Sequence, residues 1–309
     1  SSRTMSVSVV VKNAASTIGE GPHWDPASGV LWYVDIQAGD VHRYNVKTGE
    51  DTKRHIDDTV GFVTPTVSDP ETLVIGYGRR ISLLDWKTGK LTHLTDDLEP
   101  GTSSRFNDGK CDPSGRLWAG TMGYEKKMGH SGLERHKGNL YSITKGTVKH
   151  HLDNIDISNG LAWTSDNKTM FYIDSVPAKV YAFDFNLGSG EISNQRVAVD
   201  YGEDRYEEEG FPDGCCLDAE GKLWVACYNG GKVVRYDAET GQELQHITFP
   251  CKRITSVCFG GDNLDELYVT SGRLGLTDEE FKEQPLAGSL FKVTGLGVKG
   301  KPMHCYQDK

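Results

Sequence analysis

Apolar and polar positions along the chain follow a pattern that occurs six times. A short apolar segment of the VLWYVD type is followed by a second segment in which apolar and polar residues alternate before a turn of the KTGE type. Strict alternation is typical of half-buried antiparallel strands, and a short apolar run is typical of a buried strand. The apolar segments are VLWYVD, TLVIGYG, RLWAGT, TMFYID, KLWVAC and ELYVTS.

The spacing of these segments predicts the architecture. Each copy has a large apolar residue at an equivalent position, and the intervals between them are 42, 44, 53, 53 and 44 residues. These positions are Leu31, Leu73, Leu117, Met170, Leu223 and Leu267. A repeat of roughly 40 to 50 residues built from strands and Gly-rich turns is typical of propeller blades. We therefore predict an all-β protein, a six-bladed β-propeller in which residues 1–309 form a single domain.

Three local features refine this prediction. SVSVVVK near the N-terminus alternates like a strand, and we expect it to complete the last blade, which would remove an exposed sheet edge. TDEEFKEQ predicts a short helix with Thr277 as N-cap and Glu280 as its capping-box partner. The two longest intervals carry insertions at residues 122–137 and 200–211. Insertions in a repeat usually lie on the face that binds something.

Composition excludes several classes of function. The chain has 34 basic and 44 acidic residues without a Lys/Arg cluster, so we predict no nucleic-acid and no membrane partner. No apolar run is long enough to span a bilayer, and SSRTMSVSVVV is too short and too polar for a secretory signal. The seven cysteines lack CxxC spacing, which argues against a disulfide framework and predicts a cytoplasmic protein. One interpretation of Ser1 to Thr4 is an artificial extension before Met5.

The phase of the repeat locates candidate site residues. The innermost strand of each propeller blade lines the central channel, so residues at equivalent phase converge on the axis. Ten or eleven positions before each apolar marker, five of the six copies carry a polar oxygen. The six positions are Glu20, Phe62 or Val63, Asn107, Asn159, Asp213 and Ser256. Unpaired polar groups in a packed channel would cost about 2 to 7 kcal/mol each, and a shared ligand removes that cost.

Three of these side chains form a candidate metal site. Glu20, Asn159 and Asp213 offer carboxylate and amide oxygens, which favour hard cations, and two carboxylates balance one divalent charge. We predict one divalent cation, with Ca²⁺ favoured and Mg²⁺, Mn²⁺ or Zn²⁺ as alternatives. Three protein ligands leave positions open for water or substrate, which suits a catalytic metal. The alternative interpretation is that NDG, SNG and PDG are ordinary turns, because Asn and Asp before Gly favour tight turns.

Longer motifs carry a family resemblance that runs nearly end to end. They are IGEGPHW, RFNDGKCDPSGRLWAGTM, ISNGLAW, FYIDS, FPDGCCLDAEGKLWVACYNGG, ITSVCFGG and AGSLFKVTGLGVKG. Together they resemble the regucalcin, or senescence marker protein, family with its gluconolactonase and luciferin-regenerating relatives. The resemblance implies a six-bladed propeller with a divalent metal on its axis, in agreement with the phase of the repeat.

The resemblance also implies roles for single residues. Glu20, Asn159 and Asp213 match the family's metal ligands, and Asp213 also matches its catalytic base. The substrate-contacting positions fall on Arg105, Asn107 and Glu125. The match at Glu125 lies in an insertion, where GYEKKMGH departs from the family pattern.

The implied activity is hydrolysis of a sugar lactone, carried out by a monomer or weak homodimer. Asp213 would act as general base, and the metal would polarise the carbonyl. Two alternatives remain at this stage. One is a luciferin-regenerating or organophosphate-type hydrolase that uses the same site. The other is a noncatalytic calcium-binding propeller, since one fold hosts many functions.

Overall fold

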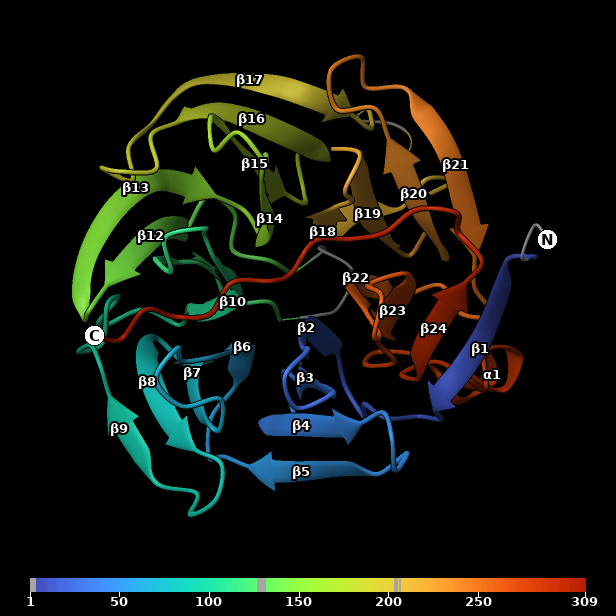
Figure 1. Cartoon of the computed structure of the whole chain (residues 1–309), viewed down its shortest axis with the longest axis horizontal. Coiled ribbons are helices and arrows are strands. Elements are labelled where there is room, and N and C mark those ends of the chain that lie inside the picture. The colour runs from blue at the N-terminus through green and yellow to red at the C-terminus, as the bar shows by residue number, and fades with distance from the viewer. Residues whose placement is uncertain (1–3, 127–131, 203–204, 206) are drawn as a thin grey trace.

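The chain forms a ring of six antiparallel sheets, each with four strands (Figure 1). The structure is a computed structural model, and it describes residues 4–126, 132–202, 205 and 207–309. The sheets are arranged around a central axis, so the protein is a six-bladed β-propeller, as the repeat predicts. We number the blades 1 to 6 in the order of their innermost strands.

Every blade has the same order of strands from the axis outward (Figure 1). The innermost strands are β2 (Gly19–Asp25), β6 (Val60–Pro65), β10 (Arg105–Cys111), β14 (Ser158–Trp163), β18 (Phe211–Leu217) and β22 (Ile254–Gly260). The second strands are β3 (Val30–Asp35), β7 (Thr72–Tyr77), β11 (Leu117–Met122), β15 (Thr169–Asp174), β19 (Leu223–Tyr228) and β23 (Glu266–Ser271). The apolar segments of the repeat are therefore the second strands.

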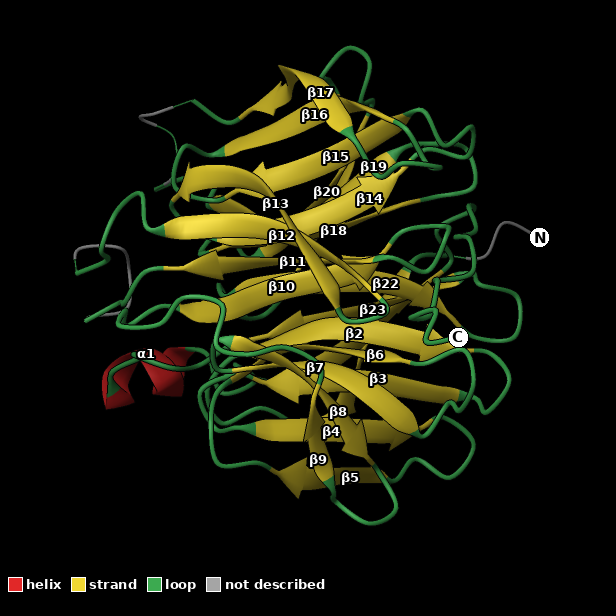
Figure 2. Ribbon diagram, turned by 90° about the vertical axis from the view of Figure 1, so that its left-hand side faces the viewer, coloured by secondary structure: helices red, strands yellow, loops and turns green. Residues whose placement is uncertain are grey.

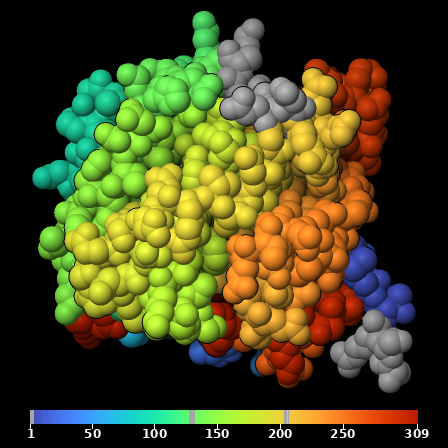
Figure 3. Space-filling view, turned by 90° about the horizontal axis from the view of Figure 1, so that it is seen from above, coloured from blue at the N-terminus to red at the C-terminus, as the bar shows by residue number. Residues whose placement is uncertain are grey.

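The outer half of each blade consists of the alternating segments and an edge strand. The third strands are β4 (Asp40–Asn45), β8 (Arg80–Asp85), β12 (Gly138–Thr144), β16 (Lys179–Phe185), β20 (Lys232–Tyr236) and β24 (Leu290–Thr294). The outermost strands are β5 (Asp51–His55), β9 (Leu91–His93), β13 (Thr147–Ile155), β17 (Ile192–Asp200), β21 (Glu243–Thr248) and β1 (Ser6–Val11). Figure 3 shows the surfaces of blades 4 and 5, in yellow-green and orange, side by side on the flank of the ring.

A local sequence, DxxGxLW, fixes the turn between the first two strands of blades 3 and 5. Asp218 is fully buried. Its carboxylate accepts a hydrogen bond from Trp224 Nε1 at 2.9 Å and further hydrogen bonds from backbone N–H groups of the turn. Asp112 does the same for Trp118 in blade 3. These carboxylates therefore hold the turn and orient a buried indole, since a buried indole N–H needs an acceptor.

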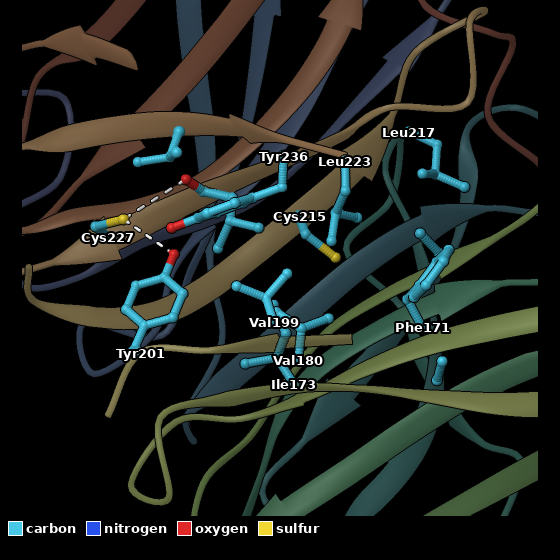
Figure 4. Packing of buried hydrophobic residues seen from close by; sticks show 14 of the residues in the cluster. Phe171, Ile173, Val180, Val199, Tyr201, Cys215, Leu217, Leu223, Cys227 and Tyr236 are labelled. Atoms are coloured by element: carbon cyan, nitrogen blue, oxygen red, sulfur yellow. Dashed lines mark hydrogen bonds between the residues drawn. The ribbon is translucent and has the colours of Figure 1, made fainter. Parts of the chain in front are cut away.

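Apolar side chains fill the space between neighbouring blades. Between blades 4 and 5, Phe171, Ile173 and Val180 pack in one cluster with Cys215 and Leu223 (Figure 4). Burial of each large apolar side chain contributes about 1.5 to 3 kcal/mol. The cysteines take part in this packing as small apolar residues, and all seven thiols are free.

The ring closes through its two ends, as predicted. Strand β1 pairs antiparallel with β24, with Ser6 opposite Thr294, and so completes blade 6. The helix α1 (Asp278–Glu283) is also confirmed, including the capping box between Thr277 and Glu280. Figure 2 shows α1 on one face of the ring, whereas the C-terminus lies on the opposite face. Among the described residues, no helix is long and apolar enough to cross a membrane.

Candidate active site

Asn107, Asn159 and Asp213 lie where the innermost strands lose their regular pairing, Glu20 and Arg105 are paired residues of innermost strands, and Glu125 lies in the β11–β12 connection. In blades 1 to 5, each innermost strand has one extra residue opposite the second strand. The shifts fall between Glu20 and His23, Val60 and Val63, Phe106 and Gly109, Ser158 and Leu161, and Pro212 and Cys215. Asn107, Asn159 and Asp213 are the first residues inside their bulges. A β-bulge redirects side chains, which accounts for polar residues that face the axis from otherwise apolar strands.

The glycines of SNG and PDG serve close packing of strands. A Cβ added to Gly160 would lie 2.8 Å from the Asp213 carbonyl oxygen, and one on Gly214 would lie 2.0 Å from Ser256 Oγ. Both glycines belong to strands, and so does the glycine of NDG. The interpretation of these motifs as tight turns is therefore wrong. Glycine is needed because neighbouring innermost strands approach each other too closely for a side chain.

The redirected side chains surround one cavity of about 50 Å³, the inner cavity. Its polar lining is Glu20, Arg105, Asn107, Glu125, Asn159, Ser175 and Asp213. Its apolar lining is Ile18, Ile36, Met122, Ile157, Phe211 and Tyr228. All six residues predicted for the site thus share this cavity. The remaining phase positions do not line it: Phe62 packs in an apolar cluster, and Ser256 lies against Gly214.

Hydrogen bonds fix the amide side of the inner cavity. Arg105 Nη1 donates to Asn107 Oδ1 at 2.9 Å, and Asn107 Nδ2 donates to Asn159 Oδ1 at 3.1 Å. Asn159 Nδ2 donates in turn to Ser175 Oγ at 2.6 Å, and the Ser175 hydroxyl donates to the carbonyl of Pro212. Because the Asn159 amide nitrogen is used in this chain, its Oδ1 is the atom left to accept a further partner.

Two buried carboxyl groups face each other on the acidic side. Glu20 and Asp213 are 4% and 7% exposed, and their side chains are in hydrogen-bond contact. Burial raises the pKa of both groups well above the ordinary range, and the charge of Asp213 raises the pKa of Glu20 further. Asp213 Oδ1 is buried without a hydrogen-bond partner among the described residues. Two close carboxyls and an unpaired oxygen fit a hard dication, which would remove their repulsion.

Further charged groups complete the electrostatics of the site. Asp108 is buried next to Asn107, and burial raises its pKa to about 6. Its charge raises the pKa of both Glu20 and Asp213. Burial lowers the pKa of Arg105 to about 10, while Glu125, Glu20 and Asp213 act in the opposite direction. The guanidinium therefore stays charged at neutral pH and offers a fixed donor beside an excess of negative charge.

A larger depression, the outer basin, adjoins the inner cavity. Its volume is about 690 Å³, and it shares Arg105 and Glu125 with the inner cavity. Gly123, Tyr124 and Lys126 of the insertion at residues 122–137 also line it, and the insertion at 200–211 contributes Phe211 to the inner cavity. Both predicted insertions thus contribute lining residues. Residues 127–131, 203–204 and 206 lie outside the described part.

Sequence reasoning missed three residues of this site. Asp108 directly follows a predicted residue, but on a strand its role depends on the bulge. Ser175 and Tyr228 come from the ends of second strands, where no repeat phase marks them. The Tyr228 hydroxyl is buried without a hydrogen-bond partner among the described residues, and burial raises its pKa, so it stays a neutral donor.

A second group of possible metal ligands lies in blade 1, outside the inner cavity. One ligand atom each from Asp35, Asp40 and His42 lies within 4.8 Å of the others, and all three residues are buried. Sequence analysis did not find this group. Asp35 is on β3 and the other two residues are on β4, so their proximity follows from the register of the two strands.

Comparison with known proteins shows where the chain belongs. Residues 18–273 match the family described as the SMP-30/Gluconolactonase/LRE-like region. The chain belongs to this family. The SMP-30/gluconolactonase match spans every residue that lines the inner cavity.

Relatives of this family cover almost the whole chain. The sequence is 44% identical to regucalcin from Gallus gallus over 286 residues, which is 92% of this chain and 93% of that protein. A solved luciferin-regenerating enzyme is 36% identical with a TM-score of 0.89, covering 98% of this chain and 100% of its own. Regucalcin from Agrobacterium tumefaciens, described as a calcium-binding protein, is 29% identical with a TM-score of 0.87 and covers 97% and 96%.

Proposed function

We propose that this protein is a divalent-cation-dependent lactonase that hydrolyses a sugar lactone, with calcium as the favoured cation. The observation that carries the proposal is the buried contact of Glu20 with Asp213, whose Oδ1 lacks a partner among the described residues. Asn159 Oδ1 belongs to the same cavity. Membership of a family named for gluconolactonase supports the reaction, and the calcium-binding bacterial relative supports the cation.

The ligands and the base come from the same few side chains. Glu20, Asn159 and Asp213 would hold the cation through oxygen atoms. When bound, a divalent cation supplies Lewis-acid polarisation of a carbonyl and stabilises negative charge that develops on its oxygen. Asp213 would accept a proton from the attacking water, a contribution that is typically about 10² to 10⁴ in rate.

The residues between the two cavities would orient the substrate. Arg105 offers several N–H donors in a fixed plane, while Asn107 and Glu125 offer acceptor oxygens for sugar hydroxyls. Tyr228 adds a neutral hydroxyl that is free to donate. Arg105 and Glu125 line both cavities, which supports a role for them in contacting a ring that would enter the inner cavity from the outer basin.

The test is lactone hydrolysis, measured by proton release from an aldonolactone. Chelation of the protein's divalent cations should abolish turnover, and added calcium should restore it. Asp213→Asn should lower kcat by at least about 100-fold, because it removes both a ligand and the base. Asp237→Asn, at an exposed turn, is the matched control and should retain full activity. Equal turnover with chelator and in Asp213→Asn would refute the proposal.

A second candidate rests on the solved luciferin-regenerating enzyme, which is similar along the whole chain. Under this second candidate function, the residues of the inner cavity would act on a larger substrate, which the outer basin of about 690 Å³ has room to hold. Parallel assays with lactones, nitriles and phosphotriesters distinguish the candidates. Tight calcium binding without turnover of any of them would instead support a noncatalytic calcium-binding propeller.

A further inference from the structure

The first blade contains an unusual pair of opposed carboxylates. Asp35 ends β3, Asp40 begins β4, and the two are direct antiparallel partners with exposed fractions of 1% and 5%. Like charges directly opposite each other on neighbouring strands are destabilising. Two buried acids in this position therefore need compensation by a positive charge.

Three of the other five blades place a basic residue at the position of Asp40, whereas β12 and β24 begin with Gly138 and Leu290. In blade 4 the same hairpin position is Lys179, opposite Asp174, and in blade 5 it is Lys232, opposite Cys227. In blade 2 the residue that begins the third strand is Arg80. A carboxylate thus stands in blade 1 where three other blades carry a basic residue, which makes its surroundings more negative.

His42 adds a nitrogen ligand to this pair. Its Nδ1 is hydrogen-bonded to Asp51 at 2.9 Å, and its ring stacks on Tyr33 with 4.6 Å between the ring centroids. Because a carboxylate accepts the Nδ1 proton, the lone pair is left on Nε2. That Nε2 is buried, in a side chain 3% exposed, and has no hydrogen-bond partner among the described residues. A histidine oriented by a carboxylate in this way is typical of metal sites.

The existing contacts of the two aspartates leave room for a cation. Asp40 contacts Lys53 Nζ at 3.2 Å and His55 Nδ1 at 2.9 Å, one partner on each oxygen. Lys53 and His55 are 60% and 70% exposed, whereas the Asp40 side chain is only 8% exposed, so the buried carboxylate cannot lose both partners without a replacement charge. A bound cation would supply that charge, and the two exposed side chains could then turn into solvent and leave lone pairs of Asp40 for the cation.

Asp35 is held more firmly. Its carboxylate accepts hydrogen bonds from the backbone N–H groups and hydroxyls of Ser16 and Thr17 and from the N–H of Ile18. These bonds fix the carboxylate in place and connect it to the segment that leads into β2, the strand of Glu20. A cation here would therefore fasten this segment to the β3–β4 hairpin.

We propose that Asp40 and His42, with Asp35 beside them, form a second cation site that takes a zinc-like transition-metal ion. One imidazole with carboxylates suits zinc, copper or nickel, whereas the oxygen donors of the inner cavity suit calcium. The two sites thus differ in donor chemistry, and each should discriminate between the two metals. The site is structural, since it lies outside the inner cavity.

Zinc binding to the purified, chelator-treated chain tests the proposal. One titration uses the double variant Glu20→Gln, Asp213→Asn, in which the inner cavity can no longer bind a cation. A parallel titration uses the unmodified chain in saturating calcium, so that calcium occupies the inner cavity and the result does not depend on the double variant. One Zn²⁺ per chain should bind in both. His42→Gln and Asp40→Asn should each weaken binding at least about 10- to 100-fold, while His93→Gln, a histidine on the edge strand of blade 2, should not.

Cobalt substitution provides an independent measurement. Co²⁺ should give a visible d–d absorption band that zinc abolishes and calcium leaves unchanged, and His42→Gln should remove it. Circular dichroism confirms that each variant is folded, and Asp40→Asn serves if His42→Gln does not fold. Zinc binding that persists in both variants, or no zinc bound at micromolar concentration, would overturn the proposal.

Discussion

The buried pair of Glu20 and Asp213 predicts a stability change whose sign depends on calcium. Glu20→Gln removes one of two carboxyls that are in contact and have little access to water. Two unit charges about 4 Å apart repel by about 4 kcal/mol at an effective dielectric constant of about 20. Protonation of one group limits this cost, so without divalent cations we expect the variant to be more stable than the natural sequence by about 1 to 4 kcal/mol.

Calcium should reverse the order of the two proteins. At 1,000 times its Kd, a ligand that binds only the folded state adds about 4.1 kcal/mol to the free energy of unfolding, which exceeds the expected advantage of the variant. The natural sequence should gain this amount, and Glu20→Gln should gain almost none, because a ligand is lost. Urea unfolding with chelator and with saturating calcium measures both effects.

Glu99→Gln is the matched control for this experiment. Glu99 is also a buried carboxylate, but the hydroxyls of Ser104, Thr121 and Tyr141 all donate to it. Its replacement should destabilise the protein without calcium and leave the gain from calcium unchanged. The reasoning fails if Glu20→Gln is less stable than the natural sequence in chelator and still gains as much from calcium.

Three further predictions follow from other contacts. Asp218→Ala should lower the free energy of unfolding by about 3 to 5 kcal/mol, because Trp224 and Arg235 lose a buried partner. Thermal unfolding measures this loss, and the control Asp237→Ala should show no comparable loss. Tyr228→Phe should raise the KM for a lactone about five- to tenfold, because the substrate would lose a hydrogen bond from the hydroxyl. The stability of the protein should not change, since this hydroxyl has no partner among the described residues. An unchanged KM would exclude substrate contact. Burial lowers the pKa of His23 from 6.5 to about 3. Between these two values the unfolded state binds a proton that the folded state does not, so the free energy of unfolding falls by about 1.4 kcal/mol for each pH unit below pH 6.5. Urea titrations at pH 4 to 7 should show that His23→Gln loses this dependence.

The fold was predictable because its signals are local and repeated. Alternation with period two marks the third strands, and the spacing of the apolar second strands gives the number of blades. The capping box of α1 and the closing strand β1 each depend on a few adjacent residues. None of these predictions requires knowledge of which residues meet across the ring.

The site was predictable only where the repeat itself carries it. Counting phase from the second strands leads to Asn107, Asn159 and Asp213 because the bulges in these blades begin at Phe106, Ser158 and Pro212, 11 or 12 residues before the markers Leu117, Met170 and Leu223. The same count also gives Phe62 and Ser256, which do not line the cavity. Phase alone cannot separate ligands from packing residues, since that depends on the side chain that each blade happens to carry.

The remaining site residues depend on tertiary structure. Tyr228 and Ser175 approach the cavity from the ends of second strands, and the other apolar wall residues lie at or next to the ends of first and second strands. In blade 1, Asp35 meets His42 and Asp40 through the register of one hairpin. The sequence VDIQAGDVH contains all three residues, but without the register a two-carboxylate, one-histidine set looks like an ordinary polar turn.

Ring closure by β1 also constrains how the protein can be made. Strand β1 is translated before blades 1 to 5, yet its partner β24 is translated nearly 280 residues later, so blade 6 cannot be finished until the strands of all the other blades have been made. Until then the first strand stays unpaired, and blades 1 to 5 form an open arc with two exposed edges. Nascent chains that stall shortly before β24 is translated should therefore be the species most dependent on chaperones.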